Sequence, residues 1–371
     1  MISSAIIPQP LARLPWRLIF LVLGIGFFGL VNLYSAAGGR IEPWALRQGL
    51  AFAFFLAVAI SISKVREGFI KQVTAPVFVT IVIMLILVDL LGFVGKGAQR
   101  WLDLGIIRLQ PSEFMKPAVG LMVARFYELL PMGEIRKFRA IWPAALLIAV
   151  PAVLVILQPD LGTGLMICFA GITVMFLAGV PLRWFLIPGL TVAAAIPVIY
   201  QFLLHGYQKR RVDTFLNPEN DPLGSGYHIT QSKIAIGSGG LFGKGYLQGS
   251  QSHLQYLPEG HTDFAFAALV EEWGMLGGTV VIVAWLMVLR WSLKVAANAP
   301  TRFGRLSCAG LNAVLFSYFA INLLMVMGLA PVVGIPLPMI SYGGSAVMTV
   351  MICLGLLMSF ERQQRSQSTL S

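Results

Sequence analysis

Charged residues are scarce in this chain. They make up 12% of its 371 residues, whereas hydrophobic residues make up 57%; a soluble protein has about 25% charged residues. Apolar runs of about 20 residues match the length needed to cross a hydrocarbon core of about 30 Å. We therefore predict an all-α integral membrane protein without a separate soluble domain. The ten runs are 17–36, 45–63, 74–94, 111–129, 140–157, 161–180, 184–204, 263–289, 306–329 and 340–359.

The sequence also lacks disulfide, metal-ligand and phosphate-loop motifs. Cys168, Cys308 and Cys353 all lie inside apolar runs, which predicts buried thiols rather than a disulfide framework. The four histidines have no spacing typical of metal ligands. A glycine-rich stretch fails as a Walker A loop because Ser238 and Gly245 occupy two of its defining positions. The first run lacks a signal-peptide cleavage site, which favours a retained helix.

Basic residues are distributed unequally between the two sides of the predicted membrane domain, which spans 1–371. Ten helices put both termini on one side, whose short loops and tails carry fifteen Lys and Arg residues. The positive-inside rule then predicts that both termini are cytoplasmic. The one long connection, 205–262 between helices seven and eight, becomes a large extracytoplasmic loop. The net charge of +11 is mostly explained by this topology, and nucleic acid is not an expected partner.

Ten basic residues remain on the outer side, where short loops tend to lose them. They predict an anionic ligand at the outer face, although pairing with phospholipid phosphates explains them as well. The outer set is Arg40, Arg47, Lys96, Arg100, Arg108, Lys209, Arg210, Arg211, Lys233 and Lys244.

Ionisable residues within apolar runs are costly and mark candidate functional positions. Glu113 and Lys116 follow Gln110 at the start of the fourth run, and their i, i+3 spacing puts them on one helix face. They form either a structural ion pair or a site in which Lys116 engages a second carboxylate or a phosphate. Asp160, in a tight outer hairpin, either caps the next helix or belongs to a site.

A polar stretch, LPEGHTDFAF, precedes the eighth apolar run. Asp263 either interacts with the helix dipole beside a capping Thr262 or acts as a catalytic carboxylate. Glu259 and His261 are interpreted as loop-positioning residues or substrate contacts.

Two further segments are predicted to be ordered. The outer loop keeps many apolar residues, and its stretch 227–236 predicts a short interfacial helix with Gln231 and Ser232 on one face. The glycines that follow permit tight turns or a close approach of backbone to a ligand. Three prolines within 330–340 predict a loop folded back into the bundle, with Ser341 at the start of the last helix.

Several segments together resemble the SEDS family (shape, elongation, division and sporulation proteins), and the elongation branch more than the division branch. The resemblance covers nearly the whole chain in the family's order. The matching text is KGAQRWLDLGIIRLQPSE, QPDLGT, YQKRRV, DPLGSGYHITQSKIAIGSGGLFGKG, LPEGHTDFAFAALVEEWG and APVVGIPLPMISYGGSA.

The resemblance implies a peptidoglycan glycosyltransferase that polymerises lipid II into glycan strands at the outer face of the bacterial cytoplasmic membrane. It also implies a partner, a monofunctional class B penicillin-binding protein, within the rod-elongation complex. The family's essential aspartate corresponds to Asp263, its cavity glutamate and lysine to Glu113 and Lys116, its helix-five acid to Asp160, and its outer arginine to Arg47.

The chemistry of glycan polymerisation is compatible with these assignments. Asp263 is the candidate general base, and fixed cations would stabilise charge on the leaving pyrophosphate. An α-linked donor and a β-linked product imply inversion by direct displacement. A divalent cation, Mg²⁺ or Mn²⁺, would find no dedicated cage in the sequence. The predicted substrate contacts are Arg47, Lys96, Arg100, Gln110, Glu113, Lys116, Asp160, Arg210, Gln231, Ser232, Lys233, Glu259, His261 and Ser341.

Two other functions fit part of the pattern. A lipid II flippase would need a polar route to the inner face, whereas the charged motifs crowd the outer half and only Glu271 and Glu272 depart from this. A non-catalytic scaffold would leave Asp263 and the outer cations without a role.

Overall fold

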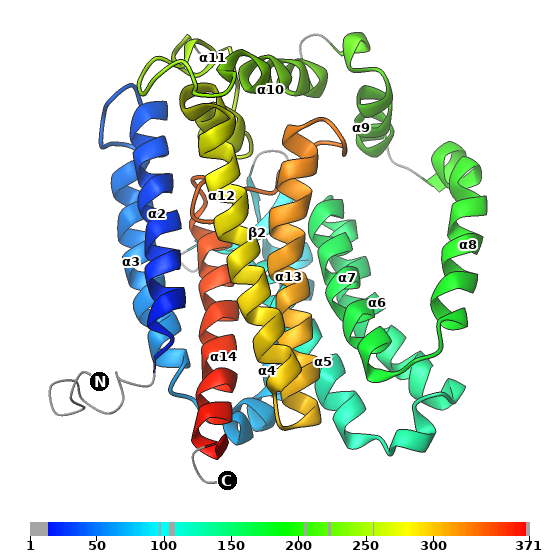
Figure 1. Ribbon diagram of the computed structural model, residues 1–371. Coiled ribbons are helices and arrows are strands. Elements are labelled where there is room, and N and C mark those ends of the chain that lie inside the picture. Colours follow the sequence, from blue (N-terminus) through cyan, green and yellow to red (C-terminus); the bar gives the residue numbers. More distant parts are fainter. Residues whose placement is uncertain are drawn as a thin grey trace, which may run out of the picture.

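The computed structural model describes residues 14–95, 98–103, 108–203, 206–221, 224–254 and 256–368. It is a bundle of long helices with both chain ends at one end of the molecule and α9 to α11 at the other (Figure 1). The long helices are α2 (Trp16–Ala36), α3 (Ala45–Ile62), α4 (Glu67–Leu91), α5 (Pro111–Leu129), α6 (Phe138–Leu157), α7 (Leu161–Ala178), α8 (Arg183–Val198), α12 (Ala265–Asn298), α13 (Arg302–Val326) and α14 (Gly344–Ser368).

Nine helices within the described residues are long and apolar enough to span a membrane. The tenth predicted span is α5, which carries four ionisable residues, Glu113, Lys116, Arg125 and Glu128. Each of them is paired: Glu113 with Lys116 at 2.7 Å, and Arg125 with Glu128 at 2.6 Å. Paired charges make a membrane position far less costly than isolated ones, so the predicted all-α membrane fold is confirmed.

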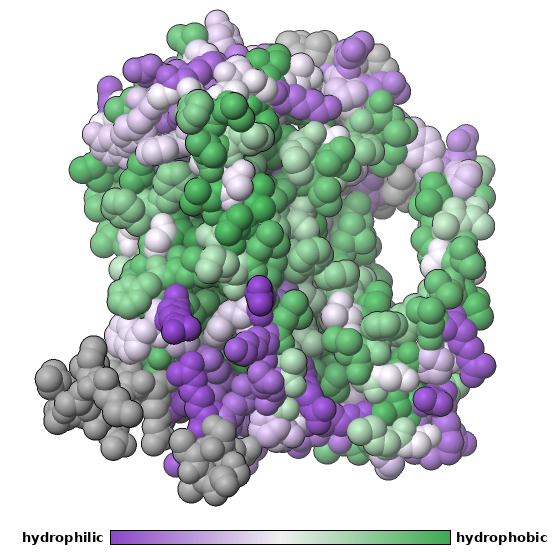
Figure 2. Space-filling model, in the orientation of Figure 1, coloured by the Kyte–Doolittle hydropathy of each residue, from purple (hydrophilic) through white to green (hydrophobic). Residues whose placement is uncertain are grey.

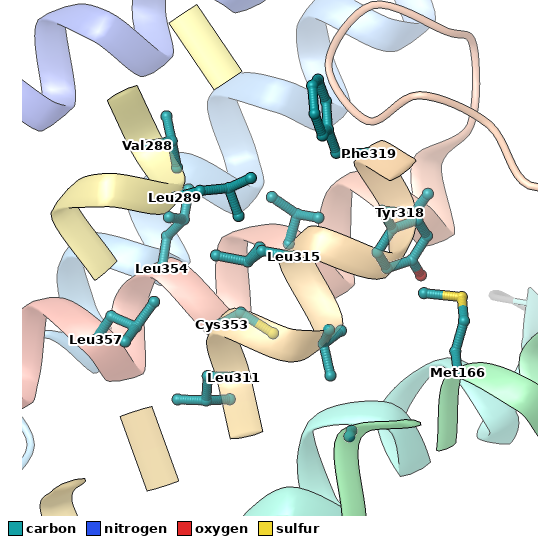
Figure 3. Packing of buried hydrophobic residues seen from close by; sticks show 14 of the residues in the cluster. Met166, Val288, Leu289, Leu311, Leu315, Tyr318, Phe319, Cys353, Leu354 and Leu357 are labelled. Atoms are coloured by element: carbon teal, nitrogen blue, oxygen red, sulfur yellow. The ribbon is translucent and has the colours of Figure 1, made fainter. Parts of the chain in front are cut away.

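The core lies where α13 packs between its neighbours. Leu311, Leu315 and Tyr318 of α13 are buried and lie among side chains of α12, α14 and α7, as Figure 3 shows. In contrast, α8 has no buried residue and stands apart from the bundle (Figures 1 and 2). An apolar belt crosses the middle of the face shown in Figure 2, with hydrophilic residues at both ends. This is the surface expected of a protein immersed in lipid.

The connections are more structured than the sequence indicates. Three short antiparallel strands, which the sequence analysis missed, lie between α4 and α5: β1 (Phe93–Gly95), β2 (Ala98–Asp103) and β3 (Arg108–Leu109). The predicted interfacial helix is present as α10 (Ser225–Gly239). The remaining elements are η1 (Met132–Glu134), η2 (Ile199–Leu203), α9 (Gly206–Leu216), η3 (Pro218–Asn220) and α11 (Ser250–His253).

The proline-rich loop before α14 folds back into the bundle, as predicted. Its residues Ile335, Leu337 and Ile340 are buried. The predicted start of the last helix was wrong, because α14 begins at Gly344. Ser341 therefore lies in the loop, where its hydroxyl accepts the Leu337 N–H at 3.0 Å.

A break in α12 explains the glycine-rich stretch of the outer loop. At Gly274 the backbone has φ 66°, ψ −168°, which interrupts the helix. The loop after α10 supplies the missing partners: the Lys244 N–H donates to the Glu271 carbonyl at 2.9 Å, and the Met275 N–H donates to the Gly240 carbonyl at 2.9 Å. The glycines of this loop make tight turns, as predicted. They also approach the backbone of α12 closely.

Gly243 provides a test of this contact. Its φ is 83°, and a β-carbon there would lie 2.0 Å from the Glu272 carbonyl oxygen. We expect Gly243→Ala to lower the free energy of unfolding by about 1–3 kcal/mol, measured by thermal unfolding in detergent. Gly237→Ala, in α10 with nothing within 4 Å of the added carbon, is the matched control. Equal stability of the two variants would contradict the contact.

Candidate active site

Asp263 lies half-buried immediately before α12, at the outer end of the bundle. Its backbone carbonyl accepts a hydrogen bond from the Asn322 side chain at 2.9 Å. The helix-cap interpretation fails for Thr262, because its hydroxyl donates to Glu259 and the N-cap residue is Phe264, without a side-chain cap. Thr262 instead fixes the shape of the turn that presents Asp263.

One buried amide joins this turn to the loop that precedes α14, and a second ties that loop to α3. The Asn322 side chain, which donates to the Asp263 carbonyl, also donates to the Ile335 carbonyl at 2.7 Å. Gln48 of α3 donates to the Ser341 carbonyl at 3.0 Å and accepts the Gly343 N–H at 3.2 Å. Neither amide can be replaced by an apolar group without leaving buried backbone groups unsatisfied. The backbone around Asp263 is therefore held from α3 and α13 at once.

The carboxylate itself faces Gly334 of the folded-back loop. A β-carbon at Gly334, where φ is 74°, would lie 3.3 Å from Asp263 Oδ2. A glycine at this position therefore places only backbone beside the carboxylate, where a β-carbon would press on it.

His261 and Glu259 line an outer cavity of about 570 Å³. The His261 ring stacks on Trp44, with centroids 4.0 Å apart and planes 8° apart. Trp44 precedes α3, and Arg47 is exposed one turn further on. The structure thus brings Glu259, His261 and Arg47 to the same outer region as Asp263.

A second cluster lies deeper, where α5, α13 and α14 meet. The Lys116 ammonium donates to Glu113 Oε1 and to the Tyr318 hydroxyl, each at 2.7 Å. Tyr318 donates to the other oxygen of Glu113, and Thr349 donates to that same oxygen at 2.7 Å. The predicted ion pair is present and fully hydrogen-bonded. Tyr318 is four residues before Asn322 on α13, so this cluster lies about one helical turn (5–6 Å) deeper than the Asp263 contact.

Asp160 both caps a helix and faces a cation. Its carboxylate accepts the Thr163 N–H at 3.2 Å at the start of α7, and it lies 3.9 Å from an Arg100 nitrogen. Arg100 also donates to the carbonyls of Gln158, at 3.1 Å, and Pro159. The hairpin between α6 and α7 is therefore tied to β2.

The other predicted contacts are distributed around these clusters. Gln110 precedes α5, and Gln231 is half-buried on α10. Ser232 is buried and donates to the Val326 carbonyl at 2.7 Å, while Lys233 is exposed beside Gly328. Lys96 lies outside the described residues, as does the side chain of Arg210.

Glu271 and Glu272 are buried at the break in α12. The Glu271 carboxylate accepts from Lys244 at 2.7 Å and from the Gln251 N–H at 2.9 Å. Glu272 accepts from Ser35 and lies 3.3 Å from His253. Both carboxylates are thus bound by the outer loop and by α2, at the outer end of α12.

Asp263 has no neighbouring cluster of metal ligands in the described part of the chain. No group of three His, Cys, Asp or Glu side chains there could hold a metal ion. A divalent cation at Asp263 would need phosphate oxygens of the substrate as its further ligands.

The sequence analysis missed several residues that build the site, namely Trp44, Gln48, Tyr318, Asn322 and Thr349. Four of them are polar residues inside helices of membrane length. Their presence at membrane depth was the signal that could have identified them.

Known proteins are similar to this chain over nearly its whole length. The family model of the cell cycle proteins FtsW, RodA and SpoVE matches residues 14–366. The chain belongs to this family. It is 43% identical to the peptidoglycan glycosyltransferase MrdB of Escherichia coli K12, covering 95% of this chain and 94% of that protein. It is 34% identical to a probable peptidoglycan glycosyltransferase FtsW of Trichlorobacter lovleyi, covering 95% and 94%.

A solved structure of a peptidoglycan synthase complex that coordinates polymerisation and crosslinking contains a similar chain. The two chains superpose with a TM-score of 0.82 and are 29% identical. The superposition covers 95% of this chain and 98% of the similar chain. Membership of the family confirms the multi-pass membrane fold and the resemblance drawn from the sequence.

The buried pair can be tested by a double-mutant cycle. Glu113→Gln and Lys116→Met should each lower the free energy of unfolding by about 3–5 kcal/mol, because each leaves an uncompensated buried charge. The double variant should lose less than the sum of the two. Chemical unfolding in detergent measures the three values, with Lys137→Met of the exposed Lys137–Glu134 pair as control. Strict additivity would show that the pair is not coupled.

Proposed function

We propose that this chain is a peptidoglycan glycosyltransferase that polymerises lipid II into glycan strands at the outer face of the bacterial cytoplasmic membrane during cell elongation. The observation that carries the proposal is a half-buried carboxylate, Asp263, held at the outer end of the bundle above a buried Glu113–Lys116 network. Identity of 43% to a named peptidoglycan glycosyltransferase supports the reaction class.

In the proposed reaction, Asp263 acts as general base. Its carboxylate accepts the proton of an acceptor sugar hydroxyl as that oxygen bonds to the anomeric carbon of the donor. The bond from the anomeric carbon to the pyrophosphate breaks, and the electron pair leaves with the lipid pyrophosphate. One displacement on the face opposite the leaving group inverts the anomeric configuration. The fixed backbone around Asp263 supports this role, because a general base must be held within hydrogen-bond reach of its proton.

The leaving pyrophosphate needs cations. Arg47 and Lys233 are exposed, and Arg100 is partly exposed beside Asp160, which makes these three the better candidates for direct contact. Lys116 is only 1% exposed and is bonded to Glu113 and Tyr318. We assign Lys116 to the electrostatics of the bundle beneath Asp263, because direct contact with the pyrophosphate would require it to leave both partners.

The proposed partners are lipid II, the nascent strand, membrane lipid and a class B penicillin-binding protein in the rod-elongation complex. The similar chain in a synthase complex that couples polymerisation with crosslinking supports the last of these. A crosslinking partner would act on the glycan strand as it leaves the outer face.

The flippase alternative is not favoured. It depended on Glu271 and Glu272 forming part of a polar route toward the inner face. Both carboxylates are bonded to the outer loop and α2 at the break in α12, so they contribute to the outer half of the molecule.

Asp263→Asn tests the proposal directly. Purified protein with its transpeptidase partner and labelled lipid II should form polymer, and the variant should lose about 10²–10⁴-fold of the rate, the usual worth of general-base catalysis. Glu219→Gln, an exposed loop carboxylate, should retain activity. Polymer from Asp263→Asn at the normal rate would remove this residue from the catalytic role. Polymer from no variant, where a control enzyme works, would favour transport or scaffolding.

Lys116→Ala tests the deeper cluster. We expect reduced polymerisation by protein that still elutes as a folded species in size-exclusion chromatography, because Glu113 would lose its cation. Normal polymerisation would assign the Glu113–Lys116 pair to packing alone.

A further inference from the structure

A polar cavity lies at the end of the molecule opposite the proposed active site. It has a volume of about 450 Å³ and lies where α2 begins and where α12 and α14 approach their ends. Both termini are at this end (Figure 1), which the positive-inside rule assigns to the cytoplasm. The cavity is therefore expected at the level of the inner-leaflet headgroups. Hydrophilic residues gather below the apolar belt at this end in Figure 2.

Three helices each contribute a cation to this cavity: Arg17 from α2, Lys294 from α12 and Arg365 from α14. One carboxylate, Glu361, also lines it and pairs with Arg365 at 2.7 Å. The formal charge of the lining is thus three positive minus one negative, or +2. The first turn of α2, at residues 16–18, also lines the cavity, and the positive end of the helix dipole adds to this potential.

Two tryptophans, Trp16 and Trp291, also line the cavity. Trp16 is 40% exposed and lies 6.0 Å, ring to ring, from Phe20 on the lipid-facing surface of α2. Within the described residues, the Trp291 indole N–H and Glu361 Oε2 are buried without a hydrogen-bond partner. Both residues line the cavity with other parts of their side chains, so the contacts with a ligand come from the charged groups of the lining.

We propose that this cavity binds the headgroup of an anionic phospholipid of the phosphatidylglycerol type from the inner leaflet. The phosphodiester matches the cations and the α2 N-terminus, and a glycerol hydroxyl can donate to the Glu361 carboxylate beside Arg365. The tryptophans suit the interface between headgroups and acyl chains. Basic pockets between membrane helices on the cytoplasmic side bind such headgroups through the same combination. This site is separate from the proposed catalytic site.

Native mass spectrometry of the full chain, after exchange into detergent with defined lipids, measures retention. Wild-type protein should retain phosphatidylglycerol in preference to phosphatidylcholine and phosphatidylethanolamine. Each cation is worth about a fivefold change in binding, so Arg17→Ala with Lys294→Ala should weaken retention about twenty-five-fold. The charge-matched control, Lys137→Ala with Arg183→Ala, removes two cations at the same end that do not line the cavity.

Four outcomes would overturn the proposal. They are equal loss of lipid by the two double variants, equal retention of phosphatidylcholine, preferential retention of phosphatidylethanolamine, and displacement by excess inorganic phosphate, which would make this a site for a soluble anion. The readout is bound lipid, so it is independent of whether the chain polymerises lipid II.

Discussion

The hydrocarbon core offers no hydrogen-bond partner, and this constraint governs the placement of polar groups throughout the structure. Two departures from regular apolar helix are accompanied by partners from other segments. The break in α12 exposes the Glu271 carbonyl, which the Lys244 N–H satisfies. The folded-back loop before α14 is held by Gln48 and Asn322. At these two places other segments of the protein provide the missing hydrogen bonds.

The same constraint separates two kinds of carboxylate. Glu113, within the bundle, has a lysine, a tyrosine and a threonine around it, so its charge is neutralised and fully hydrogen-bonded. Asp263, at the outer end, is half-buried and lies beside the Gly334 backbone. A base must exchange protons with its substrate, and a carboxylate at the interface keeps its charge at a much lower desolvation cost than one at the centre of the bilayer.

The sequence predicted most of the helices because apolar run length is a strong signal and depends on no tertiary contact. It also predicted the Glu113–Lys116 pair from i, i+3 spacing alone. The strands between α4 and α5 escaped because they are only two to six residues long. The start of α14 at Gly344 depends on Gln48, nearly three hundred positions away, so no local pattern specifies it.

The glycine-rich stretch shows the limit of reading residue types without their neighbours. Gly239 and Gly243 permit another group to approach the backbone closely, but the residue type alone does not identify that group. The structure brings them against the carbonyls of Val270 and Glu272, at distances that no β-carbon could occupy. The short first segment of α12, which begins just after Asp263, is therefore seated on this loop at one end and on Asn322 at the other. Glycines of the outer loop thus help to hold the helix segment that follows Asp263.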